Sequence, residues 1–260
     1  MQSTPSHLLQ MARPKKVKQL FKFLEDNSAH NRSIQIGFIR ESLSPATVRE
    51  RALLLGHHVL NTQAKPNLDK MHEFFSSAVG ADAFRSYQAF CGFLQVDKRD
   101  DVGLALAGQP GWGDKTAALF IRNLAIIEQT PVLRSRFWKD IHVLEGQHVA
   151  LPVDSVISFI FESLNLEMQD EAGKDFRRIN TYLRTELKYE SSEILTWDDL
   201  WFWGFITQRT NPLTKAREHC GWNGAKYWAV PHSPKDLATI KLIEKLAGRF
   251  VGIVDSSRQT

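Results

Sequence analysis

Residues 102–127 read VGLALAGQPGWGDKTAALFIRNLAII and carry the most informative pattern in the chain. Apolar residues recur at helical spacing on both sides of residues 110–113. They are Val102, Leu104 and Leu106 before that segment and Leu119, Phe120, Leu124 and Ile127 after it. We therefore predict two helices joined by a very tight turn. Gly111 and Gly113 can take the positive φ that such a turn needs.

The remainder of the chain also has the periodicity of helices. Apolar stripes lie at Met71, Phe74, Phe75 and Val79, at Phe84, Tyr87, Cys91 and Leu94, at Val156, Ile157, Ile160, Phe161 and Leu164, at Phe176, Ile179, Leu183 and Leu187, and at Leu237, Ile240, Ile243 and Leu246. Ser44 and Pro45 match an N-cap followed by a proline at the first helical position, which predicts a helix over residues 46–60. Only residues 34–38 alternate as a strand does. We expect an all-α fold.

The composition is that of a globular protein and excludes several classes. Of the 260 residues, 43% are hydrophobic and 24% are charged, which excludes a disordered or collagen-like chain. Two cysteines, Cys91 and Cys220, cannot build a four-cysteine zinc site or an iron–sulfur cluster. Residues 1–16 lack an apolar signal core, and the longest apolar runs fall far short of the roughly 20 residues of a membrane span. We expect a cytoplasmic monomer, associated with the nucleoid if the source is a prokaryote.

The net charge of +4 (33 basic minus 29 acidic residues) is unevenly distributed along the chain. Residues 161–200 carry ten acids and five bases, whereas residues 201–260 carry nine bases and four acids. Each run alone is compatible with a solvated face. Basic ends around an acidic stretch can also form a cleft with a basic rim, which a polyanion would favour.

The tight turn suggests contact with a phosphate backbone. Glycines let backbone N–H groups approach a phosphate closely, at the positive end of the following helix. We expect Gly111, Trp112, Gly113 and Thr116 to contact DNA without reading its sequence. The alternative is a plain turn between two helices that happens to contain glycines.

Lys115 falls in the first turn of the second predicted helix. The positive end of that helix and partial burial would both disfavour the ammonium form. A lysine in that state is a nucleophile that can form a Schiff base. The alternative is a lysine that only pairs with phosphate.

Asp154 precedes the apolar helix expected from Val156 onward. A carboxylate at that position is a natural N-cap. It could also stabilise positive charge that develops on a sugar, or take a proton from an attacking amine.

Two short motifs together resemble a known signature. PGWGDKTA at 110–117, followed by PVDSV at 152–156, is similar to the motif of the helix-hairpin-helix DNA glycosylases. The separation of Lys115 and Asp154 by 39 residues (154 − 115), and Asp199 four residues before Trp203, are most similar to the archaeal 8-oxoguanine glycosylases. The resemblance implies that Lys115 attacks the sugar C1′, expels the base and forms a Schiff base that permits β-elimination. It implies that Asp154 assists.

The same resemblance implies a pocket for a flipped base. It places Asp199 and Trp203 in that pocket, where Asp can accept hydrogen bonds and Trp can stack. His30 and His72 stand where the archaeal enzymes carry a glutamine and an aromatic ring. Gln63 falls where many members carry the glutamine that fills the gap left by the extruded base. The alternatives are a core position for Trp203 and an exposed helix end for Gln63.

These observations predict a bifunctional DNA glycosylase and AP lyase that excises an oxidised base from double-stranded DNA, with 8-oxoguanine favoured. We expect residues 62–152 to form the hairpin subdomain, and residues 1–61 with 153–260 to form the second subdomain, with the base pocket in a cleft between them. No cofactor is expected. Neither His57 with His58 nor His142 with His148 matches a helix-borne zinc spacing, so no metal is expected. The alternatives are a glycosylase for another damaged or modified base, and a helix-hairpin-helix module that binds DNA without catalysis.

Overall fold

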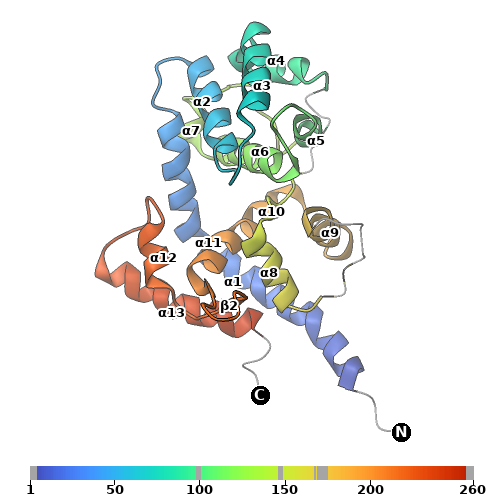
Figure 1. Cartoon of the computed structure of the whole chain (residues 1–260), viewed down its shortest axis with the longest axis vertical. Coiled ribbons are helices and arrows are strands. Elements are labelled where there is room, and N and C mark those ends of the chain that lie inside the picture. The colour runs from blue at the N-terminus through green and yellow to red at the C-terminus, as the bar shows by residue number, and fades with distance from the viewer. Residues whose placement is uncertain (1–4, 98–100, 146–148, 167, 169–174, 256–260) are drawn as a thin grey trace. The chain divides into compact units, whose positions relative to one another are not determined.

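A computed structural model describes residues 5–97, 101–145, 149–166, 168 and 175–255 of the chain (Figure 1). Most of these residues are helical, and the one sheet among them has two short strands, so the expected all-α fold is confirmed. In the part of the chain so described, we find no helix with both the length and the apolar character needed to cross a bilayer.

The elements in chain order are α1 (Pro5–Ser42), α2 (Val48–Leu60), α3 (Leu68–Gly80), the 3-10 turn η1 (Ala83–Arg85), α4 (Tyr87–Phe93), α5 (Val102–Ala107), α6 (Asp114–Gln129), α7 (Pro131–Arg134), α8 (Ser155–Ser163), α9 (Asp175–Thr181), the π-helical turn η2 (Tyr182–Glu186), α10 (Ser191–Trp197), α11 (Asp199–Thr207), β1 (Gln208–Thr210), β2 (Arg217–His219), α12 (Gly224–Ala229) and α13 (Leu237–Val254).

The chain forms two compact units, each with its own core. Unit 1 consists of Met1–Ile34, Val153–Tyr182 and Thr196–Thr260, and unit 2 of Gln35–Pro152 and Leu183–Leu195. The division falls within helix α1, which begins in unit 1 and ends in unit 2. Unit 2 therefore includes residues 35–61, which the division expected from the sequence assigns to the other subdomain.

Helix α6 is the centre of unit 2. Its apolar stripe and small residues bury most of its length, and α2, α5 and α7 pack on it. An aromatic cluster continues this core. In it the ring centroids of Phe90 and Phe120 lie 5.6 Å apart, and Trp138 Nε1 donates a hydrogen bond to the Phe84 carbonyl at 2.9 Å. Burial of these large side chains supplies most of the stabilisation of the unit.

The core of unit 1 joins helices from distant parts of the sequence. Trp203 on α11 packs edge-on against Phe23 of α1, with ring centroids 5.1 Å apart, and lies nearly parallel to Phe250 of α13 at 6.4 Å. Trp197 packs on Phe21 and Phe161. Helix α8 lies against α11, so the segment that follows Asp154 is held by the same core.

Two local expectations are wrong. Residues 34–38 are helical, because Ile34 and Ile39 face the core on the continuous helix α1 and no neighbouring strand is present in the described chain to pair with them. The helix expected from residue 46 begins at Val48 instead. Its N-cap is Thr47, which forms a capping box with Glu50 that satisfies the first amide groups of the helix.

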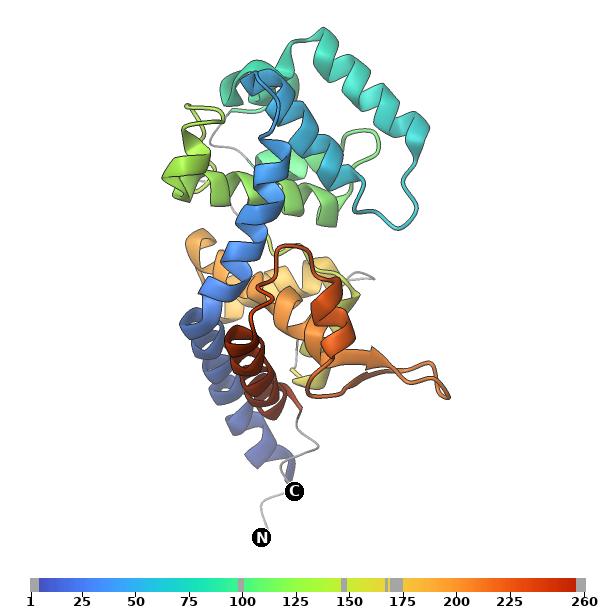
Figure 2. The ribbon, with the colours of Figure 1, turned by 90° about the vertical axis from the view of Figure 1, so that its left-hand side faces the viewer.

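The sequence pattern did not predict the hairpin of β1 and β2. Its strands pair in antiparallel register, with Arg209 opposite Glu218, and their side chains form an ion pair at 2.5 Å. At the tip, Asn211 Oδ1 accepts the N–H groups of Leu213 and Thr214. Figure 2 shows that the hairpin extends away from the helices of unit 1, and the Leu213 side chain at its tip is 90% exposed.

The close contact of α8 and α11 leads to a prediction about how a substitution at Gly204 changes stability. A Cβ at this position would lie 2.6 Å from Val156 Cγ1 and 2.7 Å from Ile160 Cδ1. Because such overpacking outweighs the helix propensity of alanine, Gly204→Ala should lower the free energy of unfolding by about 1–3 kcal/mol. Urea unfolding followed by circular dichroism measures this change.

The matched control is Gly248→Ala on α13, where an added Cβ meets nothing within 4 Å. This variant should be more stable than the wild type by about 0.5–1 kcal/mol, because alanine favours a helix. A Gly204→Ala variant as stable as Gly248→Ala would contradict the packing described for unit 1.

Candidate active site

The turn between α5 and α6 is the first part of the candidate site and lies in unit 2. Gly111 has a φ of +81°, the left-handed conformation expected for it. The positive φ expected at Gly113 is wrong. This residue is extended, with a φ of −158°, and serves as the N-cap of α6. It has no side chain to bond to the first amide groups of the helix, so no side chain caps α6 at this position.

Three contacts within unit 2 hold the turn in place. Gln63 Nε2 donates a hydrogen bond to the Gly111 carbonyl at 3.0 Å. The Trp112 ring packs edge-on against Phe74 and Phe120, with centroid distances of 5.3 and 5.6 Å. Gln63 and Trp112 are thus positioned at the turn, but in this structure both contact protein. Their contacts with DNA stay predictions.

Lys115 and Thr116 begin helix α6 directly after this turn. The Thr116 side chain is buried, whereas Lys115 is exposed. The partial burial expected for Lys115 is therefore not found. Its ammonium has no hydrogen bond or ion pair with any residue in the described ranges, so the nitrogen is open to a ligand.

Asp154 is the N-cap of α8, as its sequence position predicted. Its Oδ1 accepts the N–H groups of Val156 at 2.9 Å and Ile157 at 3.1 Å. The half-buried carboxylate also lines a cleft of about 620 Å³ inside unit 1, between α8, α9 and β2. Glu162, Asp175 and Arg217 line the same cleft. Three carboxylates against one guanidinium make this cleft unfavourable for a phosphate.

Three of the four predicted base-pocket residues lie together in unit 1. His30 approaches Trp203 edge-on with ring centroids 6.1 Å apart, and Asp199 Oδ1 accepts a hydrogen bond from Asn31 Nδ2 at 2.8 Å. Both Asp199 and Trp203 are buried, and the indole is fully covered. The core position that was the alternative for Trp203 is thus what the structure shows. Stacking of a base on this ring stays a prediction.

The buried indole N–H of Trp203 has no acceptor within the described chain. A buried donor without a partner costs about 1–3 kcal/mol, and the indole N–H of Trp112 in unit 2 is in the same state. Burial also lowers the pKa of the neighbouring His30. His30 and Trp203 therefore place two polar rings next to the aromatic core of unit 1.

His72 lies on α3 in unit 2, exposed, with its ring nitrogens 3.4 Å from the Ser76 hydroxyl. No hydrogen bond or ring contact joins the His72 side chain to another candidate residue among the described residues, although the backbone of the adjacent Met71 lies against Gly111.

Sequence reasoning missed two residues that the structure singles out. Asn31 holds Asp199, and Arg122 is buried on α6, where it donates a hydrogen bond to Gln35. An arginine inside the apolar run LFIRNLAII was the available signal, because a buried guanidinium needs dedicated partners. Arg122 follows Lys115 by seven residues, so both share one face of α6.

Comparisons with protein-family models, curated proteins and solved structures found no match to this chain.

The conformation of Gly111 leads to a prediction about the turn. An added Cβ would lie 3.1 Å from the Met71 N atom and 3.3 Å from the Lys70 carbonyl carbon, and both belong to the backbone of α3. Because the left-handed φ also disfavours a side chain, Gly111→Ala should lower the free energy of unfolding by about 1–2 kcal/mol. Gly113→Ala is the control. Its φ suits any residue and its Cβ meets nothing within 4 Å, so chemical denaturation should show a smaller loss.

Burial of His30 leads to a prediction about pH. Because the folded pKa lies below the ordinary value of 6.5, the unfolded chain binds the proton more readily. The unprotonated His30 ring therefore contributes stability above pH 6.5, and this contribution is lost as the pH falls through the pKa of His30 in the folded state. Urea unfolding at pH 7.5 and 5.5 should therefore show a smaller loss of stability on acidification in His30→Gln than in the wild type. Equal losses of stability in His30→Gln and the wild type would contradict a lowered pKa of His30 in the folded state.

Proposed function

We propose that this chain is a DNA N-glycosylase with AP lyase activity, which acts on an oxidised base in duplex DNA, with 8-oxoguanine as the first candidate. One observation carries the proposal. Lys115 stands exposed in the first turn of α6, immediately after a turn whose Gly111 has the left-handed backbone that the hairpin motif requires. The resemblance of residues 110–117 and 152–156 to the glycosylase signature indicates the class of reaction.

The turn suits a phosphate of the DNA backbone. Because Gly113 has no capping side chain, a phosphate oxygen can accept hydrogen bonds from the first amide groups of α6. The partial positive charge at the helix N-terminus favours that anion. Gln63 and Trp112 would support this contact by holding the turn rigid. Such a contact fixes the position of the protein on DNA but reads no base.

In the proposed reaction, the nitrogen lone pair of Lys115 Nζ attacks C1′ of the damaged nucleotide. The bond from C1′ to the base breaks, and the base leaves with that electron pair and takes up the proton that the attacking nitrogen of Lys115 releases. Opening of the sugar then gives a Schiff base between Nζ and C1′. Loss of a C2′ proton and expulsion of the 3′-phosphate complete β-elimination. The resemblance to the glycosylase signature gives Asp154 of unit 1 the assisting role, which its carboxylate would fill while it also caps α8.

The group around Trp203 is our candidate for base recognition. A purine carbonyl or ring nitrogen would satisfy the indole N–H that has no acceptor, and His30 and Asp199 would offer further polar atoms. Because the Trp203 indole is fully buried, recognition of a base by this ring requires neighbouring side chains of unit 1 to move when the base is inserted. Recognition at this spot would favour a base rich in hydrogen-bonding groups over an alkylated one.

One observation favours a second candidate, a hairpin module that binds DNA without catalysis. Both cap hydrogen bonds of Asp154 are those of an ordinary N-cap, and they give it a structural role that needs no reaction. In that case Lys115 is a phosphate contact only.

Borohydride trapping tests the proposal. The full chain is incubated with duplexes that each carry one lesion, namely 8-oxoguanine, thymine glycol, uracil, an alkylated purine or an abasic site. Reduction of a Schiff base should give a covalent adduct with the 8-oxoguanine duplex, visible by gel electrophoresis. Lys115→Gln should abolish the adduct, and Asp154→Asn should reduce its rate at least about tenfold, because removal of one stabilising group costs that much or more.

Lys241→Gln is the matched control, because it removes one exposed lysine of α13 and should leave trapping unchanged. An adduct with the abasic site alone would keep the lyase and overturn 8-oxoguanine as substrate. If no duplex gives an adduct while DNA binding is normal, the lysine mechanism is wrong. A salt slope that falls by about one charge in Lys115→Gln would then identify the binding module.

A further inference from the structure

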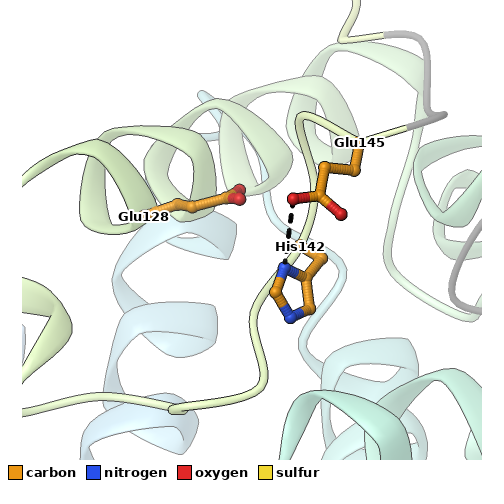
Figure 3. A group of neighbouring side chains, drawn as sticks. All are labelled: Glu128, His142 and Glu145. Atoms are coloured by element: carbon orange, nitrogen blue, oxygen red, sulfur yellow. Dashed lines mark ion pairs between the residues drawn. The ribbon is translucent and has the colours of Figure 1, made fainter.

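A cluster of metal-ligating side chains lies in unit 2, apart from the turn and Lys115. Glu128 comes from the end of α6, and His142 and Glu145 come from the chain that follows α7. One ligand atom from each lies within 4.8 Å of the other two. Figure 3 shows that the carboxylates of Glu128 and Glu145 both approach the imidazole of His142 from the same side.

The distance between His142 and Glu145 fits two ligands of one cation. The His142 Nδ1 and Glu145 Oε1 atoms are 3.7 Å apart, which is too long for a hydrogen bond. Two ligands each about 2.1 Å from a shared ion lie roughly 3–4 Å apart, so this separation needs little change. The Glu145 side chain is 78% exposed and free to rotate, so the wider separations within the cluster can also close.

The Nδ1 atom of His142 is a buried acceptor or donor that no group satisfies. It is shielded from solvent and has no hydrogen-bond partner among the described residues, although the imidazole as a whole is 37% exposed. An unpaired buried polar atom costs free energy, and a bound ion at this point would remove that cost. This observation is independent of the two carboxylates.

Glu128 is already oriented by the backbone. Its Oε2 accepts the N–H of Val143 at 2.9 Å and that of Leu144 at 3.2 Å. Backbone donors of this kind orient a ligating carboxylate and lower the entropy lost on binding. The other oxygen, Oε1, has no hydrogen bond to the described part of the chain and can therefore face an ion.

We infer that Glu128, His142 and Glu145 bind a borderline divalent cation of the Zn²⁺ class, with water completing the coordination. One imidazole and two carboxylates suit Zn²⁺, whereas Mg²⁺ prefers oxygen ligands alone and Cu⁺ prefers sulfur. Two carboxylates also balance the double positive charge. The ion would tie the end of α6 to the chain that follows α7.

The spacing in sequence did not reveal this group, because Glu128 and His142 are 14 residues apart (142 − 128) and belong to no helix-borne motif. His148, the other histidine considered for a metal, lies outside the described residues. The inference does not depend on glycosylase activity.

Calorimetric titration of the chelator-treated full chain with Zn²⁺ tests the site. We expect one ion per chain with a dissociation constant of about 10 µM or lower. Both His142→Ala and Glu145→Gln should weaken binding at least about tenfold, because each removes a direct ligand. Affinity should also fall as the pH is lowered, because ligating groups must be deprotonated. Circular dichroism checks that the variants are folded.

Glu186→Gln, which removes one exposed carboxylate elsewhere in unit 2, is the matched control and should bind as the wild type does. Titration with Co²⁺ gives an optical readout, because its visible absorption should show nitrogen and oxygen ligation in the wild type and disappear in His142→Ala. Three results would each overturn the inference: no saturable binding at 100 µM Zn²⁺, binding unchanged in both ligand variants, or binding lost in His57→Ala instead.

Discussion

The burial of helix α6 is the constraint on which the rest of unit 2 depends. From Thr116 to Ile127 almost every side chain of this helix faces other helices, so its axis and rotation are determined by packing. The N-terminus of α6, with Gly113 and the exposed Lys115, is therefore held in a defined place. At its other end, Glu128 anchors the loop that carries His142. The candidate DNA-contacting turn and the candidate cation site therefore both depend on the packing of this one helix.

The core of unit 1, like that of unit 2 with Arg122 and Gln35, accommodates buried polar groups. Asn31 and Asp199 form a buried hydrogen bond, and the indole of Trp203 is packed among phenylalanines with its N–H unsatisfied. A core built only for stability would place a phenylalanine at such a position. A donor at this position has a physical explanation if a ligand supplies the acceptor, and this is the basis on which we propose base recognition by unit 1.

Periodicity predicted the helices well, because apolar spacing reports directly on which face of a helix is buried. It failed at residues 34–38, where two isoleucines two positions apart belong to a long helix, and at β1 and β2, whose three-residue strands contain too few apolar residues to form a pattern. At the site, the N-cap role of Asp154 followed from its position before an apolar run. The burial of Arg122 and the grouping of Glu128 with His142 depend on tertiary packing, which no local pattern contains.

The path of the chain through the two units has a consequence for synthesis. The chain passes between the units four times, and the core of unit 1 joins Phe23 to Phe250, which a ribosome adds 227 residues later (250 − 23). Residues 35–152 of unit 2 can pack while translation continues, whereas the apolar face of α1 waits for α13. During that interval this face is exposed to chaperones and to other nascent chains, so the part of α1 that belongs to unit 1 is buried only after α13 has been made.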